Sequence, residues 1–134
     1  MEKRIVIRGI LIAYHEEGKG NEAIVFLHGW RSNGAVWRPL IDCLELNGKK
    51  LYSLDLPGFG MSEMPKERLT LGDYAGIVEG FVTAACPGSK TVLIGHSFGA
   101  RIGIKIAAQN PEWLERLVLV GSGGAPMNPA ERGM

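Results

Sequence analysis

The chain has 134 residues, 46% of them hydrophobic and 22% charged, and a formal net charge of +1 at pH 7. This length allows one compact domain with a hydrophobic core. The small net charge argues against nucleic-acid binding, which usually needs a basic patch or stripe. No apolar run approaches the ~20 residues that span a bilayer, and the N-terminus lacks the apolar stretch of a signal peptide. We therefore expect a cytoplasmic protein that binds neither nucleic acid nor membranes.

The sequence carries no complete motif for a metal or a cofactor. Cys43 and Cys86 lie far apart and form no Cys-x-x-Cys pair, which is the usual signal of a metal site or a redox pair. The glycine-rich segment 121–124 follows an apolar run, and such a loop can bind phosphate. However, no helix pattern follows it, and neither the phosphate-loop nor the dinucleotide-binding motif is completed. We expect no metal and no cofactor.

Strand and helix patterns alternate along the chain. The predicted strands are 4–8, 10–15, 23–27, 50–54, 90–94 and 116–120. The predicted helices are 34–46, 71–85 and 98–109. The first two strands form a leading hairpin, and the continuous apolar run 23–27 is typical of a strand buried on both faces. This order predicts a mostly parallel sheet with helices on both faces.

The first predicted helix rests on apolar spacing. Its apolar residues at helical spacing are Val36, Trp37, Leu40, Ile41 and Leu44. Asn47-Gly48 provides a natural stop. Pro39 lies inside the stretch and is expected to delay the regular part of the helix, because proline lacks an amide N–H and clashes with the preceding turn.

The segment Gly95-His96-Ser97-Phe98-Gly99 matches the G-x-S-x-G motif. It lies between a predicted strand and a predicted helix, which is the context that gives this motif meaning. A serine there occupies a strained turn that lifts its hydroxyl above the sheet edge. Gly95 and Gly99 are needed because the chain passes close by on both sides. The N-terminus of the following helix favours developing negative charge, so we predict that Ser97 is a nucleophile.

Three blocks in this order resemble the α/β-hydrolase superfamily, in the branch of serine esterases and carbon–carbon bond hydrolases. The blocks are Leu27-His28-Gly29-Trp30, the segment 55–62 (Asp-Leu-Pro-Gly-Phe-Gly-Met-Ser) and 95–99. The resemblance covers nearly the whole chain. It implies that residues 1–126 form the N-terminal part of an α/β-hydrolase core, with about six strands of an eight-stranded sheet and three helices. Residues 127–134 are then a linker toward an absent lid region.

The resemblance also implies a reaction, namely hydrolysis of a carboxylic ester or related acyl bond through a serine acyl-enzyme. The substrate would be a small acyl compound, whether ester, thioester, amide or vinylogous diketone. The backbone N–H groups of Trp30 and Phe98 would form the oxyanion hole, where losing one donor typically costs ~3–4 kcal/mol. Supporting residues would be His28, Gly29, Gly95, His96 and Gly99. We interpret His28 as a structural histidine that hydrogen-bonds nearby backbone.

The chain departs from the family pattern after Ser97. In this fold the triad runs serine, acid, histidine along the chain, but the three histidines, His15, His28 and His96, all precede Ser97. His96 is adjacent to Ser97 on a tight turn and is expected to point away from it. Asp55 is interpreted as architectural, because the acid of the family comes later. We therefore expect the chain to be inactive alone or completed by another chain.

Three hypotheses follow for the missing triad residues. The chain is a truncated hydrolase, one half of a split enzyme, or a non-catalytic binding or assembly module that keeps the hydrolase scaffold. Strand 116–120 would be an exposed apolar edge, which invites pairing with another chain. We therefore expect a homo-oligomer or a complex with a complementary hydrolase fragment.

Overall fold

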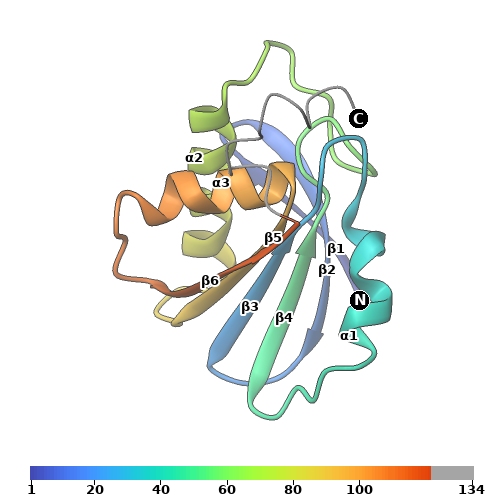
Figure 1. Ribbon diagram of the computed structural model, residues 1–134. Coiled ribbons are helices and arrows are strands. Elements are labelled where there is room, and N and C mark those ends of the chain that lie inside the picture. Colours follow the sequence, from blue (N-terminus) through green and yellow to red (C-terminus); the bar gives the residue numbers. More distant parts are fainter. Residues whose placement is uncertain (122–134) are drawn as a thin grey trace, which may run out of the picture.

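The structure, a computed structural model, describes residues 1–121 as one mixed sheet flanked by helices (Figure 1). The strands are β1 (Glu2–Ile7), β2 (Ile10–Gly18), β3 (Glu22–Leu27), β4 (Lys49–Leu54), β5 (Thr91–His96) and β6 (Leu114–Val120). The helical segments are the 3-10 turn η1 (Gly34–Trp37), α1 (Arg38–Ile41), α2 (Leu71–Ala85) and α3 (Phe98–Ala107). The linker predicted at 127–134 lies outside the described residues.

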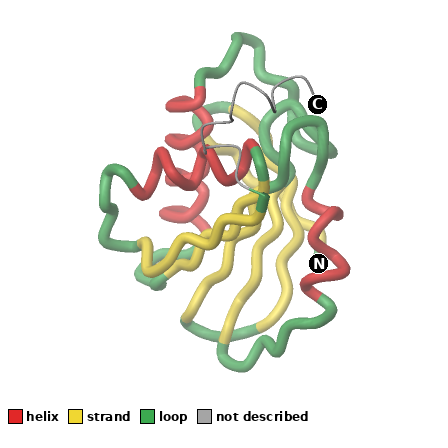
Figure 2. The backbone as a smooth tube through the Cα atoms, in the orientation of Figure 1, coloured by secondary structure: helices red, strands yellow, loops and turns green. Residues whose placement is uncertain are grey.

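The strands pair in the order β1-β2-β4-β3-β5-β6. The pairs β1–β2 and β2–β4 are antiparallel, whereas β4–β3, β3–β5 and β5–β6 are parallel. The hairpin between β1 and β2 turns at Arg8 and Gly9, both with positive φ, as a two-residue hairpin turn of the primed type requires. The predicted α/β architecture with a mostly parallel sheet is confirmed, and Figure 2 shows the helices lying outside the sheet.

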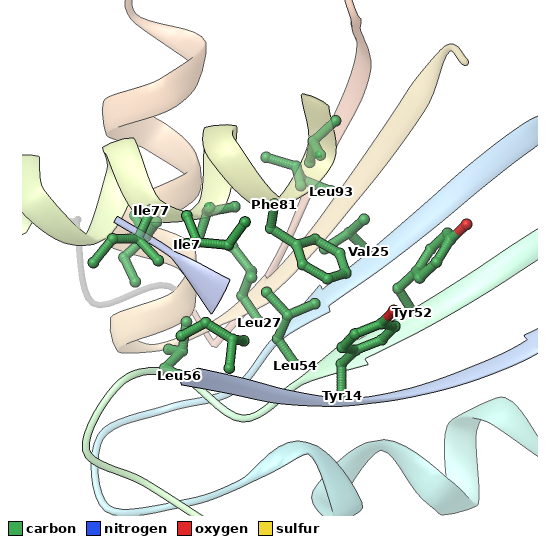
Figure 3. Close-up of a cluster of buried hydrophobic side chains, with 14 of the residues drawn as sticks. Ile7, Tyr14, Val25, Leu27, Tyr52, Leu54, Leu56, Ile77, Phe81 and Leu93 are labelled. Carbon is green, nitrogen blue, oxygen red and sulfur yellow. The ribbon is translucent and has the colours of Figure 1, made fainter. Parts of the chain in front are cut away.

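Helices cover both faces of the sheet, so there are two cores. On one face α2 and α3 pack over the sheet, and Phe81 of α2 lies against Tyr14 and Tyr52, with ring centroids 4.9 and 5.7 Å away (Figure 3). On the other face η1 and α1 bury Trp37 against Phe26, with centroids 5.0 Å apart. The parallel strands read as continuous apolar runs because both of their faces are covered.

Helix α2 has the bounds that its sequence predicts. Thr70 and Asp73 form a reciprocal capping box, in which the Thr70 hydroxyl accepts from the Asp73 N–H and the Asp73 carboxylate accepts from the Thr70 N–H. The buried face consists of Tyr74, Ala75, Ile77, Val78, Phe81 and Val82. None of the described helices is both long and apolar enough to cross a membrane.

The helix predicted over 34–46 is wrong in length. The chain forms the turn η1 and then the single helical turn α1, which ends at Ile41. Pro39 lies in the first turn of α1, where its missing N–H removes no helical hydrogen bond. Of the five apolar residues at helical spacing, only Trp37 and Ile41 are buried, while Val36 is 52% exposed and Leu44 36% exposed. The apolar spacing therefore overstated the face that packs on the sheet.

Strand β6 lies at one end of the strand order and pairs with β5. Its C-terminal residues Val118, Leu119 and Val120 are 37%, 42% and 41% exposed. Within residues 1–121 this strand therefore presents a free edge with apolar side chains, in the position that the sequence predicted.

Candidate active site

Ser97 lies at the turn between β5 and α3, on a backbone that side chains rarely adopt. Its φ is 51° and its ψ is −108°. Such a conformation in a non-glycine residue is typically destabilising by about 1–3 kcal/mol and persists only where its surroundings hold it. Ser97 is the N-cap of α3, yet its hydroxyl makes no capping hydrogen bond. The side chain is half-buried, and within residues 1–121 its hydroxyl forms no hydrogen bond.

The two motif glycines create the space for this turn. A Cβ on Gly95 would lie 2.6 Å from the carbonyl carbon and oxygen of Gly99. A Cβ on Gly99 would overlap the carbonyl oxygen of Leu27. Distances this short are excluded sterically, so both positions require glycine. The first turn of α3 thereby rests on the ends of β5 and β3.

The loop after β3 passes beside the serine. An ideal Cβ on Gly29 would lie 3.5 Å from the Cβ of Ser97 and 3.3 Å from Cδ2 of His96. Within residues 1–121 the amide N–H groups of Trp30 and Phe98 donate to no protein acceptor. For Phe98 this is expected, because the first N–H groups of a helix have no intrahelical partner. Two unengaged amides therefore lie in the segments that flank Ser97.

His28 is fully buried, and both of its ring nitrogens are engaged. The backbone N–H of Leu56 donates to Nε2 over 2.9 Å, so Nδ1 carries the proton and donates to the Gly29 carbonyl over 2.7 Å. Burial lowers the pKa of His28 below its ordinary value of 6.5, although the Gly29 carbonyl and Asp55 oppose this shift. Neutral His28 thus ties the loop after β3 to the loop after β4.

The Asp55 carboxylate accepts hydrogen bonds from backbone N–H groups of two loops, one after β3 and one after β4. Its Oδ1 accepts from the Gly34 N–H over 2.7 Å, and its Oδ2 accepts from the Met61 N–H over 2.9 Å. The Ser62 hydroxyl donates to the Asp55 carbonyl oxygen. These contacts match the architectural interpretation of Asp55, since both carboxylate oxygens accept from loop amides.

The other two histidines are bonded elsewhere. His96 is exposed, and its Nδ1 donates to the Val120 carbonyl over 2.9 Å. His15 on β2 lies between Glu2 and Glu17, with both nitrogen-to-oxygen distances 2.6 Å. The Arg38 guanidinium, followed by His15, lowers the pKa of Glu17 to about 2. Among residues 1–121, no histidine forms a hydrogen bond with Ser97, and no cluster of His, Cys, Asp and Glu suited to a metal ion is found.

An aromatic pocket opens next to the turn, with a cavity volume of about 660 Å³. Trp30 is 57% exposed and makes edge contacts with Phe59 and Phe98, with ring centroids 4.8 and 5.0 Å away. Tyr74 of α2 completes the wall, 5.1 Å from Phe98, and donates its hydroxyl to the Pro57 carbonyl over 3.1 Å. Sequence patterns alone did not identify Phe59 and Tyr74 as pocket residues. In the sequence, Tyr74 matches the spacing of a helix that packs on the core, so nothing marks it as a pocket residue. Phe59 offered a signal, because it is an aromatic residue within the Pro57–Gly60 loop.

Comparison with known proteins shows the family of the chain. A family model described as alpha/beta hydrolase fold matches residues 22–132. The chain is 35% identical over 105 residues to a pimeloyl-[acyl-carrier protein] methyl ester esterase of Wigglesworthia glossinidia brevipalpis, covering 78% of this chain and 38% of that protein. It is 31% identical over 121 residues to a 2-(acetamidomethylene)succinate hydrolase of Mesorhizobium japonicum, covering 90% of this chain and 42% of that protein.

Solved structures show the same likeness. The epoxide hydrolase VrEH1 from Vigna radiata superimposes with a TM-score of 0.85 at 26% identity, covering 96% of this chain and 42% of that one. The haloalkane dehalogenase DatA from Agrobacterium tumefaciens C58 gives a TM-score of 0.81 at 27% identity, with coverages of 91% and 41%. The chain spans about two fifths of the length of these relatives. It belongs to the alpha/beta hydrolase family, which confirms the expected family and fold.

Proposed function

We propose that this member of the alpha/beta hydrolase family provides the nucleophile and the oxyanion hole of a serine hydrolase for carboxylic esters or related acyl bonds. The observation that carries the proposal is Ser97, held at φ 51° between β5 and α3 with its hydroxyl outside any capping bond. A backbone conformation of this kind is retained where function needs it. The methyl ester esterase among the relatives supports ester cleavage.

The proposed reaction follows from the groups around the turn. The Ser97 hydroxyl oxygen attacks the carbonyl carbon of the substrate while a general base takes its proton. The tetrahedral oxyanion accepts hydrogen bonds from the Trp30 and Phe98 N–H groups, and the N-terminus of α3 adds a favourable dipole. Collapse of the tetrahedral intermediate breaks the bond between the acyl carbon and the alkoxy oxygen. The leaving alcohol takes the proton that the general base holds. Water then hydrolyses the acyl-enzyme and frees Ser97.

We assign the general base to a histidine other than His15, His28 and His96. His28 donates through Nδ1 and accepts through Nε2, so it has no free nitrogen for the Ser97 proton. His15 is held by Glu2 and Glu17. His96 donates through Nδ1 to the Val120 carbonyl, and within residues 1–121 it forms no hydrogen bond with the Ser97 hydroxyl. These are the three histidines of the 134 residues, so residues outside this segment, such as those of a complementary hydrolase fragment, would supply both the base and its acid.

The aromatic pocket is the proposed site for the substrate. Trp30, Phe59 and Phe98 line this pocket with apolar ring surface, and Phe98 directly follows Ser97 in the chain. An apolar wall with few polar groups is the usual lining of a small-molecule site. The proposal includes a small acyl substrate and a cytoplasmic location, both as predictions.

Acetylation by p-nitrophenyl acetate tests the nucleophile directly, because the leaving group is activated and added imidazole can replace an absent base. We expect acetyl-Ser97 in the folded chain, located by peptide mass spectrometry, and faster formation with imidazole. Ser97→Ala removes the modified peptide. Ser89→Ala serves as a matched control, because Ser89 lies in the turn before β5, away from the pocket, and is expected to leave acetylation unchanged.

Two outcomes would contradict the proposal. The first is folded protein without acetyl-Ser97 at any imidazole concentration, which would favour the non-catalytic binding module. The second is equal acetylation in Ser97→Ala, which would show that another nucleophile reacts. Circular dichroism of each variant confirms that the comparison is made between folded chains.

A further inference from the structure

The rim of the aromatic pocket carries positive charge that the proposed reaction does not use. Lys66 and Arg68 lie on the loop that precedes α2, and Arg101 lies on the first turn of α3. Within residues 1–121, Glu67 is the only acidic residue that lines this pocket. Three cations against one carboxylate leave a local excess of positive charge at the mouth of an apolar pocket.

Within the described part of the chain, these three cations form no salt bridge that would stabilise the fold. Lys66, Arg68 and Arg101 are exposed, and within residues 1–121 none of them forms an ion pair. Arg38 provides the contrast, because its guanidinium binds Glu17 at 2.8 Å on the other side of the sheet. Cations left without carboxylate partners around an apolar pocket are available to an anionic ligand.

Arg101 links this charge to the nucleophile. Its backbone N–H donates to the Ser97 carbonyl over 3.1 Å, so it lies one helical turn from Ser97. Phe98 and Arg101 are three residues apart on α3 and therefore share a helix face, and both line the pocket. A ligand that packs on the Phe98 ring with its reactive carbon at Ser97 can thus place a charged end near Arg101.

We propose that this pocket selects acyl substrates that carry an anionic group, either a carboxylate or a phosphate. The apolar part of the substrate would lie against Trp30, Phe59 and Phe98, and the anion would lie at the rim formed by Lys66, Arg68 and Arg101. This inference deepens the proposed function and rests on it, because it takes the pocket beside Ser97 as the substrate site.

The expected preference is moderate because the rim is exposed to solvent. One exposed ion pair changes a binding constant by about 1.5- to 5-fold, so three cations together should favour an anion by about tenfold. The preference should weaken as salt is raised, because the Debye length falls from about 30 Å at 0.01 M to about 8 Å at 0.15 M.

Ligand binding tests the inference without any turnover. Octanoate and octanamide share a chain length and differ in charge, and neither is an ester. We would titrate each into the full chain and follow tryptophan fluorescence, with Trp30→Phe identifying the pocket signal. The dissociation constant of octanoate is expected to be about tenfold lower than that of octanamide at low salt. Octyl phosphate then shows which of the two anions binds more tightly.

Two triple variants with the same net charge test whether the preference for octanoate arises at the pocket rim. K66Q/R68Q/R101Q should bind octanoate and octanamide equally. R4Q/K19Q/R116Q removes three exposed cations that lie outside the pocket lining, lowers the net charge by the same amount, and should keep the preference. Equal binding of the two ligands by the wild-type chain, binding of neither, or a preference that survives in K66Q/R68Q/R101Q would overturn the inference.

The two proposals fail in different ways. Acetylation of Ser97 without any preference for octanoate would overturn the inference on charge and leave the serine hydrolase proposal intact. A preference for octanoate with no acetylation of Ser97 would support the anion-binding pocket and contradict the catalytic role of Ser97.

Discussion

Gly99 packs directly against the carbonyl oxygen of Leu27, with no room for a Cβ between them. This contact joins the first turn of α3 to the end of β3. It therefore brings Ser97 beside the loop that contains Gly29 and Trp30. The close approach of two backbones, rather than any hydrogen bond of the serine side chain, positions the proposed nucleophile and oxyanion loop.

Gly99→Ala is expected to destabilise the protein by about 3 kcal/mol, because the added methyl group overlaps backbone atoms that cannot rotate away. Gly72→Ala is the control, since a Cβ there has its nearest neighbour at 3.7 Å, and alanine should be neutral or slightly stabilising. Urea denaturation measures both. Equal stability of the two variants would contradict the close packing of α3 on β3.

Ser97→Gly should be more stable than Ser97→Ala by about 1 kcal/mol. Glycine adopts positive φ without the steric penalty of a Cβ, whereas alanine keeps that penalty. The gain is reduced by the greater entropy of glycine in the unfolded chain. Thermal unfolding of the two variants gives the comparison, and a more stable Ser97→Ala would show that the turn is not strained.

Stability should fall in wild-type protein as pH drops below about 6.5, and His28 is expected to contribute to this loss. Burial lowers the pKa of His28 in the folded state, so below pH 6.5 the unfolded chain binds a proton that the folded chain does not. His28 therefore contributes stability that is present above pH 6.5 and is lost as pH falls through the folded pKa. Denaturation of wild type and His28→Gln between pH 8 and 5 tests this, and parallel pH profiles would contradict it.

Asp55→Asn should destabilise the fold without removing the reactivity of Ser97. An amide retains one acceptor oxygen for Gly34 or Met61 and loses the other, which typically costs about 1–3 kcal/mol. Acetylation of Ser97 in the folded fraction should match wild type. Loss of acetylation in folded Asp55→Asn would instead place Asp55 in the catalytic machinery.

The exposed edge of β6 predicts self-association or a complex with a complementary fragment. Val118, Leu119 and Val120 are more than a third exposed, and an apolar edge strand pairs readily with another chain. Sedimentation velocity at micromolar concentration should show a species larger than the monomer, and Leu119→Lys should shift it toward the monomer. A folded monomer in the wild type would contradict this expectation.

Sequence patterns correctly predicted helix α2 and the turn at Ser97, because residues close in the sequence determine both. The capping box at Thr70 gives α2 its start, and the motif around Ser97 predicted both the turn and the glycines on its two sides. The prediction of one helix over 34–46 was too long, because spacing alone does not show which apolar residues reach the sheet. The pocket was missed because Trp30, Phe59 and Phe98 come from three segments that meet only when β3, β4 and β5 pair.

Ser97 is proposed to be a nucleophile that the fold holds in a reactive position. Peptide mass spectrometry of the folded chain after exposure to p-nitrophenyl acetate and imidazole tests it most directly. We expect acetyl-Ser97 in wild type and in Ser89→Ala, and its loss in Ser97→Ala. A folded wild-type chain that stays unmodified at Ser97 would contradict the account and leave a scaffold without catalytic chemistry.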